Sequence, residues 1–305
     1  MSITGAAGEQ FAPAGGDLIG LERSPRPLDR SVQARRATWY KNPALMAGLI
    51  ITGIVLIAAI IAPLITFYNP ITQNLTDALQ GPSAAHWLGT DQFGRDTWTR
   101  LVYGARLDLR IAFIAVLFPF TLGVVLGSIA GYFGGWADTI IMRVVDVVVA
   151  FPFYVLLIAL VFVLGPGARS IYIAITLVGW VSYARIVRGE ILVAKRQEYV
   201  LAAQSAGLSN TRIMGRHLMP NVISQAIIYG MSDIVQDILA IVTLGYLGLG
   251  IPPPAAEWGS MINGGQNFLS THWELTTFPG LAVILVGLGL SLIGDGLADL
   301  LRPGQ

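Results

Sequence analysis

Six long apolar runs constrain the fold of this 305-residue chain more than any other feature. A helix needs about 20 consecutive apolar residues to cross the roughly 30 Å hydrocarbon core of a bilayer. Inside hydrocarbon a helix also satisfies its own backbone hydrogen bonds. The sequence therefore predicts an all-α polytopic membrane protein with six transmembrane helices. The predicted spans are Pro43–Phe67, Ile111–Tyr132, Asp138–Leu164, Ile171–Ile186, Asn221–Ile251 and Phe278–Leu301.

The composition agrees with a chain whose main solvent is lipid. Hydrophobic residues make up 54% of the sequence and charged residues only 12%, with a mean hydropathy of +0.65. The net charge of +1 gives no overall field that would favour nucleic acid as a partner. Cysteine is absent, and the three histidines, His86, His217 and His272, lie far apart in the sequence. We therefore expect membrane lipid around the chain, and we predict no metal site.

The distribution of positive charge predicts the orientation. Arg35, Arg36 and Lys41 directly precede the first apolar run, whereas residues 252–277 contain neither lysine nor arginine. Because basic residues collect on the cytoplasmic side, six spans place both termini in the cytoplasm. Residues 1–42 are then expected to form a largely mobile cytoplasmic tail, and residues 43–305 a transmembrane domain. Its predicted outer loops cover residues 68–110 and 252–277.

The predicted cytoplasmic loop 187–220 has an unusually regular pattern. A first short helix with a pair of alanines ends at a glycine that can adopt the left-handed C-cap conformation. A second short helix begins at a Ser or Asn cap and stops at a proline. This pattern predicts a compact helix–turn–helix projection suited to docking in a cleft of another protein. In chain order these residues are Ala202 and Ala203, Gly207, Ser209 or Asn210, and Pro220.

This loop resembles the EAA loop of permeases in bacterial binding-protein-dependent ABC importers. The form from Tyr199 to Asn221 is closer to the peptide/nickel branch of that family, although the motif's acidic position is Leu201 here. In relatives this loop docks the ATPase. The matching motif positions are Ala202, Ala203, Gly207, Met219 and Pro220. The residues expected to dock the ATPase are Glu198, Tyr199, Ala202, Ala203, Gly207, Ser209, Arg212, His217 and Pro220.

Other segments resemble the C-type permease of dipeptide and oligopeptide importers. Four separated motifs in the right order are more specific than any one of them. The resemblance extends from Trp39 to Pro303, which is nearly the whole chain except the tail. The additional motifs lie at His86 to Asp96 and on to Arg106, Gly134 to Pro152, Tyr246 to Gly259, and Gly294 to Leu297.

The resemblance implies a non-catalytic permease of type I importer fold in the bacterial inner membrane. It also implies a second homologous permease, two cytoplasmic ABC ATPases that bind ATP and Mg, an extracytoplasmic solute-binding protein, and a peptide substrate. The sequence agrees on one point, because neither of its two lysines, Lys41 and Lys195, completes a glycine-rich phosphate loop. We therefore expect no cofactor in this chain.

Four residues of the predicted outer loops are candidate contacts for the binding protein: Asp91, Arg95, Asp96 and Trp258. Each has a simpler interpretation. Asp96 and Arg100, four apart on a predicted helix, are expected to form a solvated ion pair, and Asp91 is expected to cap that helix. Trp258 is expected to anchor the chain at the membrane interface.

Two carboxylates, Asp233 and Asp237, lie four apart in the fifth predicted span. A carboxylate at membrane depth is costly unless it faces a protein partner or water. Their shared helical face is therefore a candidate lining of the translocation path, and a structural hydrogen-bonding role is the alternative.

Three glycines at a spacing of four, Gly123, Gly127 and Gly131, form a stripe of small residues in the second span. Such a stripe allows close approach of another helix. It predicts either static packing or a surface that slides in a moving bundle.

Other functions remain as alternatives. In an ion-coupled secondary carrier, Asp233 and Asp237 would be coupling sites, but the sequence shows no internal repeat of the kind such carriers have. A membrane enzyme is disfavoured because no metal-binding His/Glu spacing and no nucleophile elbow is present. Within the importer class, the solute could instead be nickel, glutathione or an oligosaccharide.

Overall fold

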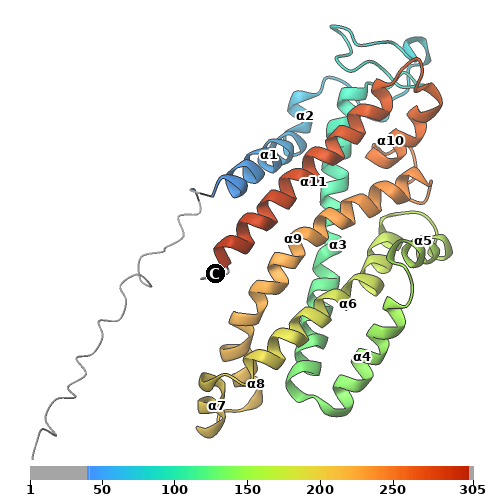
Figure 1. Cartoon of the computed structure of the whole chain (residues 1–305). Coiled ribbons are helices and arrows are strands. Elements are labelled where there is room, and N and C mark those ends of the chain that lie inside the picture. The colour runs from blue at the N-terminus through green and yellow to red at the C-terminus, as the bar shows by residue number, and fades with distance from the viewer. Residues whose placement is uncertain (1–39, 41, 302–305) are drawn as a thin grey trace, which may run out of the picture. The chain divides into compact units, whose positions relative to one another are not determined.

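A computed structural model describes Tyr40 and residues 42–301, and their regular secondary structure is helical (Figure 1). The predicted tail, residues 1–42, lies outside this part of the chain except for Tyr40 and Asn42. Within this described part of the chain, five helices are long and apolar enough to cross a membrane. These are α1 (Pro43–Ile60), α3 (Thr97–Phe133), α6 (Ala168–Ala194), α9 (Met219–Tyr246) and α11 (Glu274–Leu301). The shorter elements are α2 (Ala62–Ile65), η2 (Leu75–Asp77), α4 (Gly135–Val149), α5 (Phe153–Leu164), α7 (Glu198–Ser205), α8 (Asn210–Arg212), η3 (Ile213–Leu218), α10 (Trp258–Gly265) and η4 (Gln266–Phe268).

The third predicted span is not one straight helix. It consists of α4 and α5, which meet at 88°. The break lies at Ala150 to Pro152, where the proline has no N–H to donate and disfavours helical geometry in the residue before it. The prediction of six spans therefore holds when α4 and α5 are counted together as one broken span.

Several helix boundaries differ from the predicted ones. α3 begins at Thr97, well before the predicted Ile111, because Asp96 caps it by accepting a hydrogen bond from the Thr99 N–H at 2.8 Å. α9 ends at Tyr246 instead of continuing to residue 251, and Gly248 then turns the chain with φ 77°. Hydropathy did not locate these ends, because a helix can begin outside the bilayer and an apolar run can continue past the end of a helix.

α3 and α6 pack with their backbones in contact. A Cβ added to Gly123 would lie 2.4 Å from the Trp180 carbonyl oxygen, and one added to Gly127 would lie 2.6 Å from that of Ala184. Only glycine permits this approach. The predicted packing role of the glycine stripe is therefore confirmed. A second close pair joins α1 to α11, since a Cβ on Gly48 would lie 2.7 Å from the Gly289 carbonyl oxygen.

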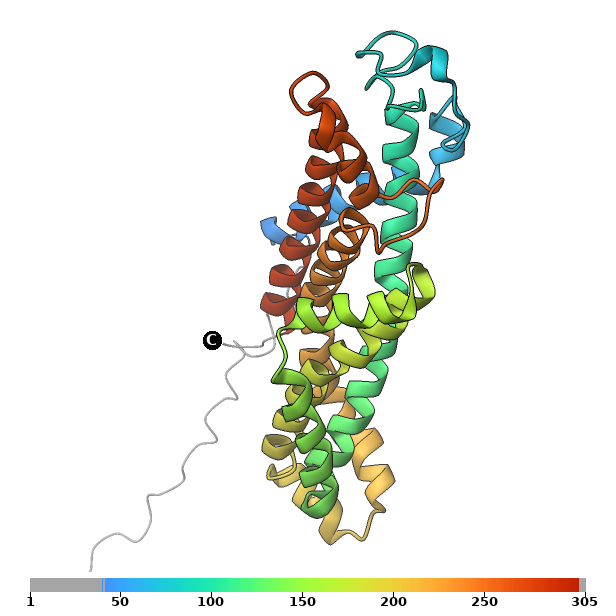
Figure 2. The same cartoon turned by 90° about the vertical axis from the view of Figure 1, so that its right-hand side faces the viewer.

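The bundle of residues 42–301 has two distinct ends. α7 and α8 lie at one end, and α10 lies at the other with the connection between α2 and α3 (Figures 1 and 2). Between the ends, the outward faces of α1 and α11 are apolar, as a lipid-facing surface requires. The largest exposed side chains there are Ile50, Ile54, Ile57, Ile60, Leu281, Ile284, Leu285 and Leu288.

Candidate functional site

The turn after α7 has the geometry that the sequence predicted. Gly207 adopts a left-handed conformation with φ 75°. Its N–H donates to the Gln204 carbonyl at 2.9 Å, and the Leu208 N–H donates to the Ala203 carbonyl at 3.2 Å. This pair of bonds is the Schellman arrangement that ends a helix. No atom lies within 4 Å of a Cβ placed on Gly207, so the glycine is required by backbone conformation alone.

The second half of this loop differs from the prediction. α8 follows Ser209, whose carbonyl accepts from the Arg212 and Ile213 N–H groups at 2.9 Å, but whose side chain makes no capping bond. The chain continues through the π-helix η3 directly into α9. The prediction that Pro220 stops this helix was wrong. Pro220 is the second residue of α9, directly after η3, and the helix continues through it.

We call residues 197–220 the docking loop. Val200 and Ala203 are buried against the end of α6, so one face of the loop belongs to the bundle. The other face is open and includes two large side chains, Tyr199 and Leu201, which are 41% and 48% exposed. Among the predicted docking residues, Ala203 is buried, His217 is half-buried, and the exposed ones are Glu198, Tyr199, Ala202, Gly207, Ser209, Arg212 and Pro220. The ATPase-docking role of these residues stays a prediction.

Polar contacts hold the docking loop, and the end of α6 that leads into it, to the end of α3. The Tyr132 hydroxyl donates to Asn210 Oδ1 at 2.9 Å, joining the end of α3 to the loop. Lys195 Nζ, at the end of α6, donates to the Gly131 carbonyl at 2.8 Å. Sequence reasoning missed these contacts because they join residues that are far apart in the chain.

A charged pair that the sequence did not predict lies near the same end. Arg188 of α6 binds Asp138 of α4 through two parallel contacts, Nε to Oδ1 at 2.5 Å and Nη2 to Oδ2 at 2.7 Å. One signal was available in the sequence. An arginine in an apolar helix predicts a carboxylate partner, because an unpaired charge there is costly.

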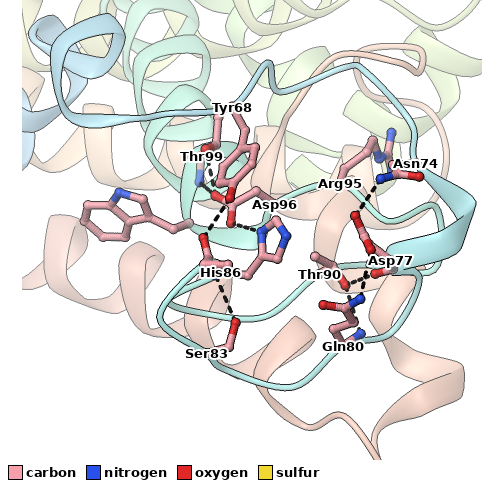
Figure 3. Close-up of polar contacts among 12 residues, drawn as sticks. Tyr68, Asn74, Asp77, Gln80, Ser83, His86, Thr90, Arg95, Asp96 and Thr99 are labelled. Atoms are coloured by element: carbon pink, nitrogen blue, oxygen red, sulfur yellow. Dashed lines mark hydrogen bonds and ion pairs between the residues drawn. The ribbon is translucent and has the colours of Figure 1, made fainter.

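At the opposite end, Asp96 holds the start of α3 (Figure 3). Its Oδ1 lies 2.9 Å from His86 Nδ1, and its Oδ2 accepts from the Thr99 hydroxyl at 2.7 Å. The Tyr68 ring lies against the His86 imidazole, with 4.6 Å between the ring centroids. The predicted ion pair between Asp96 and Arg100 was wrong, because both oxygens of this carboxylate are used by the helix cap and by His86.

Asp91 pairs with two arginines. Its Oδ2 lies 2.8 Å from Arg95 Nε and 3.4 Å from Arg100 Nε, and its Oδ1 accepts the Phe93 N–H at 2.9 Å. The predicted cap role was wrong because α3 begins later, at Thr97. Gly94, with φ 68°, turns the chain between Asp91 and the start of α3. Asp91 therefore stabilises the loop before the helix instead of the helix itself.

Trp258 lies inside the bundle and is only 1% exposed. Its indole N–H donates to the Leu101 carbonyl at 2.9 Å, and its backbone N–H donates to Asp108 Oδ2 at 3.0 Å. A Cβ on Gly104 would lie 2.8 Å from the indole Cδ1, so this glycine makes room for the ring. The interfacial-anchor interpretation of Trp258 was therefore wrong, since the ring packs against α3.

Glu257 caps α10 and is fully buried. It accepts the Gly259 N–H at 2.6 Å and the Ser260 N–H at 2.8 Å. Burial raises the pKa of Glu257 to about 6, although these backbone hydrogen bonds act in the opposite direction. Sequence reasoning missed Glu257, and an acidic residue directly before a Trp-Gly pair was a usable signal for a helix cap.

The four candidate contacts for a binding protein, Asp91, Arg95, Asp96 and Trp258, are all buried in this chain. Arg95 borders a pocket of about 470 Å³ at the α10 end, with Gln92 and Phe93 on its rim. Of the four, only Arg95 is among the residues that line this pocket. Their contact with a partner stays a prediction.

Asp233 and Asp237 lie on one face of α9, as predicted, and both are buried within the chain. The Tyr183 hydroxyl of α6 donates to Asp233 Oδ2 at 2.7 Å, whereas Oδ2 of Asp237 has no hydrogen-bond partner among the described residues. A separate groove between α6 and α9, of about 680 Å³, is lined by polar groups such as Glu190, Gln225 and Ser232. The path role of the two carboxylates stays a prediction.

Comparison with known proteins places these features in a family. A family model described as the binding-protein-dependent transport system inner membrane component matches residues 123–305. A second, described as the N-terminal TM domain of oligopeptide transport permease C, matches residues 33–82. In addition, a chain of the methionine ABC transporter MetNI, in an inward-facing conformation, has a TM-score of 0.54 at 18% identity. It covers 67% of this chain and 96% of its own length, and at this identity it shows the fold alone.

Similar sequences cover most of the chain. A dipeptide transport system permease protein of Alkalihalophilus pseudofirmus is 42% identical over 263 residues, which are 86% of each chain. An oligopeptide transport system permease protein of Bacillus subtilis is 40% identical over 296 residues, 97% of this chain and 96% of the relative. A glutathione transport system permease protein of Pectobacterium atrosepticum is 40% identical over 73% of this chain and 74% of its own. The chain therefore belongs to the family of inner-membrane components of binding-protein-dependent transport systems, as a multi-pass, non-catalytic permease subunit.

Proposed function

We propose that this permease forms, with a second homologous permease, the path through which dipeptides or oligopeptides enter the cell. In this proposal an extracytoplasmic binding protein delivers the peptide, and two cytoplasmic ATPases supply the energy by binding ATP and Mg. The names of the dipeptide and oligopeptide relatives support peptide as the solute. The match to a glutathione permease relative is compatible with the same choice, because glutathione is itself a small peptide.

The observation that carries the proposal is the form of the docking loop. A helix ended by Gly207 exposes Tyr199 and Leu201 while its other face is buried in the bundle. A connecting loop gains nothing by ordering exposed apolar side chains, whereas a docking element needs a few large side chains around which a partner can close. Leu201 stands where the family motif has an acid, so we expect an apolar contact with the ATPase at this position.

The orientation follows from charge. Arg196, Arg212 and Arg216 are exposed at the docking-loop end, whereas residues 252–277 near α10 contain no lysine or arginine. The docking loop and both termini then lie in the cytoplasm. The α10 end faces the binding protein, and the pocket bordered by Arg95 lies on that surface.

Replacing Gly207 by valine tests the docking role. A β-branched residue in a left-handed conformation is strained, so Gly207→Val should distort the end of α7. We expect a lower amount of co-purified ATPase and less peptide transported per ATP hydrolysed. Gly53→Val, on α1, is the matched control because a Cβ there also meets no atom within 4 Å. Wild-type coupling and ATPase recovery in Gly207→Val would contradict the proposal.

The path role of Asp233 and Asp237 is tested by removing charge without changing shape. If either carboxylate faces the path in some state of the cycle, Asp233→Asn or Asp237→Asn should change the uptake of charged peptides at normal complex yield. If the carboxylates are structural, the same variants should lower complex yield and leave uptake per complex unchanged. Cysteines at 233 and 237 that resist a small water-soluble thiol reagent in every nucleotide state would exclude the path role, because the native chain has no cysteine to react.

A further inference from the structure

The α3–α4 corner depends on a special backbone conformation. Gly134 and Gly135 both have positive φ, 66° and 56°, and no atom lies within 4 Å of a Cβ at either position. Val145 is the only buried residue of α4, and it packs, with the partly buried Ile141, Met142 and Val148, against a small apolar cluster on α6. The orientation of α4 therefore depends strongly on the few contacts that it makes with α6.

The strongest polar contact between α4 and α6 is the pair of Asp138 and Arg188. Asp138 lies in the first turn of α4, and both of its oxygens meet the guanidinium, at 2.5 and 2.7 Å. Two parallel hydrogen bonds fix the relative orientation of the two groups as well as their distance. The side chains keep 22% and 31% exposure, so the pair adds little to stability in spite of this geometry. The pair therefore acts mainly by fixing the orientation of α4 relative to α6.

The same corner is tied to the docking loop. Lys195, which directly follows α6, binds the Gly131 carbonyl near the end of α3 at 2.8 Å. Tyr132, the next residue of α3, binds Asn210 in the loop at 2.9 Å. Val200 and Ala203 of the loop pack in one cluster with residues of α6. A displacement of the docking loop is therefore carried into the end of α6 and into the α3–α4 corner.

We propose that the Asp138–Arg188 pair is a positioning link that passes movement of the docking loop from α6 to α4, and so to the broken span that α4 forms with α5. This inference rests on the proposed docking of an ATPase at the loop. α3 and α6 move as one unit because their backbones touch along the glycine stripe. α4 meets α6 through side chains, and without the link only the apolar contacts around Val145 and the longer contact between Arg185 and Asp146 tie it to that unit, so it follows less closely. Loss of the pair then separates ATP hydrolysis from transport without preventing assembly.

The test uses the complete importer, with its ATPases and binding protein, in proteoliposomes. Asp138→Asn and Arg188→Gln should assemble in normal yield and hydrolyse ATP, while peptide transported per ATP falls about 2- to 30-fold, the range expected for a coupling element. Asp138→Glu, which keeps the charge, should recover part of the loss. The double variant should lose no more than either single variant, because both changes break the same link.

A second pair between the same two helices provides a matched control. Arg185 Nη2 lies 3.6 Å from Asp146 Oδ1, a single contact between side chains that are 50% and 59% exposed. Asp146→Asn should keep wild-type coupling. An equal loss of coupling in Asp146→Asn would overturn the inference, as would wild-type coupling in Asp138→Asn. It would also be overturned if the losses of Asp138→Asn and Arg188→Gln multiply when the two changes are combined. If ATPases do not associate even with the wild-type chain, the proposed function itself is contradicted. That result is distinguishable from a failure of the positioning link, in which the wild-type complex assembles and transports.

Discussion

The contact between α3 and α6 allows one prediction to be worked out from atomic distances. In Gly127→Ala, the added Cβ would lie 2.6 Å from the Ala184 carbonyl oxygen and 2.9 Å from its Cα. Both obstacles are backbone atoms, so neither can rotate away. Restoring an ordinary contact of 3.4 Å requires a separation of about 0.8 Å (3.4 − 2.6). Overpacking of this kind costs about 1–3 kcal/mol.

The matched control is Gly53→Ala on α1, where the new Cβ meets no atom within 4 Å. Both substitutions gain the same helix propensity, about 1 kcal/mol, so their difference isolates the packing cost. The assay is thermal unfolding of the purified protein in detergent, followed by tryptophan fluorescence. Gly127→Ala should melt at least about 2 °C below Gly53→Ala. Equal melting temperatures would refute the backbone contact between the two helices.

Three further predictions concern other regions. Because burial raises the pKa of Glu257 to about 6 from an ordinary 4.5, the folded state binds the proton more tightly than the unfolded chain does. The stability that this protonation provides is present below pH 4.5 and is lost as pH rises through 6, so the free energy of unfolding should fall by about 2 kcal/mol over this range. Glu257→Gln should flatten this pH dependence when unfolding is measured at about pH 4.5 and about pH 8. Asp96→Ala removes the cap of α3 and should lower the free energy of unfolding by about 1–2 kcal/mol. Asp77→Ala should cost less, because the side chain of the half-buried Asp77 of η2 accepts hydrogen bonds, among the described residues, only from the exposed side chains of Asn74 and Gln80. Deletion of residues 1–30, with Arg35, Arg36 and Lys41 kept, should preserve membrane insertion and uptake, and a normally inserted chain without uptake would contradict this.

Much of the fold could be predicted because it follows from local rules. Apolar runs place the long helices, since the bilayer demands them, and the glycine spacing in α3 identified a packing face. Gly207 was predictable because a left-handed helix end has a strong preference for glycine. The break between α4 and α5 also had a local signal, Pro152, although the long apolar run concealed it.

The polar contacts could not be predicted because the fold, more than spacing along a helix, decides which partners meet. Asp96 was assigned to Arg100 by its spacing of four, but the fold brings His86 to one oxygen and the Thr99 backbone to the other. Asp138 and Arg188 are separated by 50 residues, so only the packing of α4 against α6 identifies which carboxylate pairs with this arginine. Trp258 was placed at a lipid interface because its type favours that location, whereas the fold provides a buried site beside Gly104.

The most direct test of the account is reconstitution of this permease into liposomes, first alone and then with its partner permease, ATPases and binding protein. The measurement is accumulation of labelled dipeptide, with ATP inside the vesicles or with an ion gradient across the membrane. The account predicts accumulation only in the complete complex with ATP and binding protein present, and none with the chain alone. Accumulation of peptide by the chain alone, driven by an ion gradient, would contradict it.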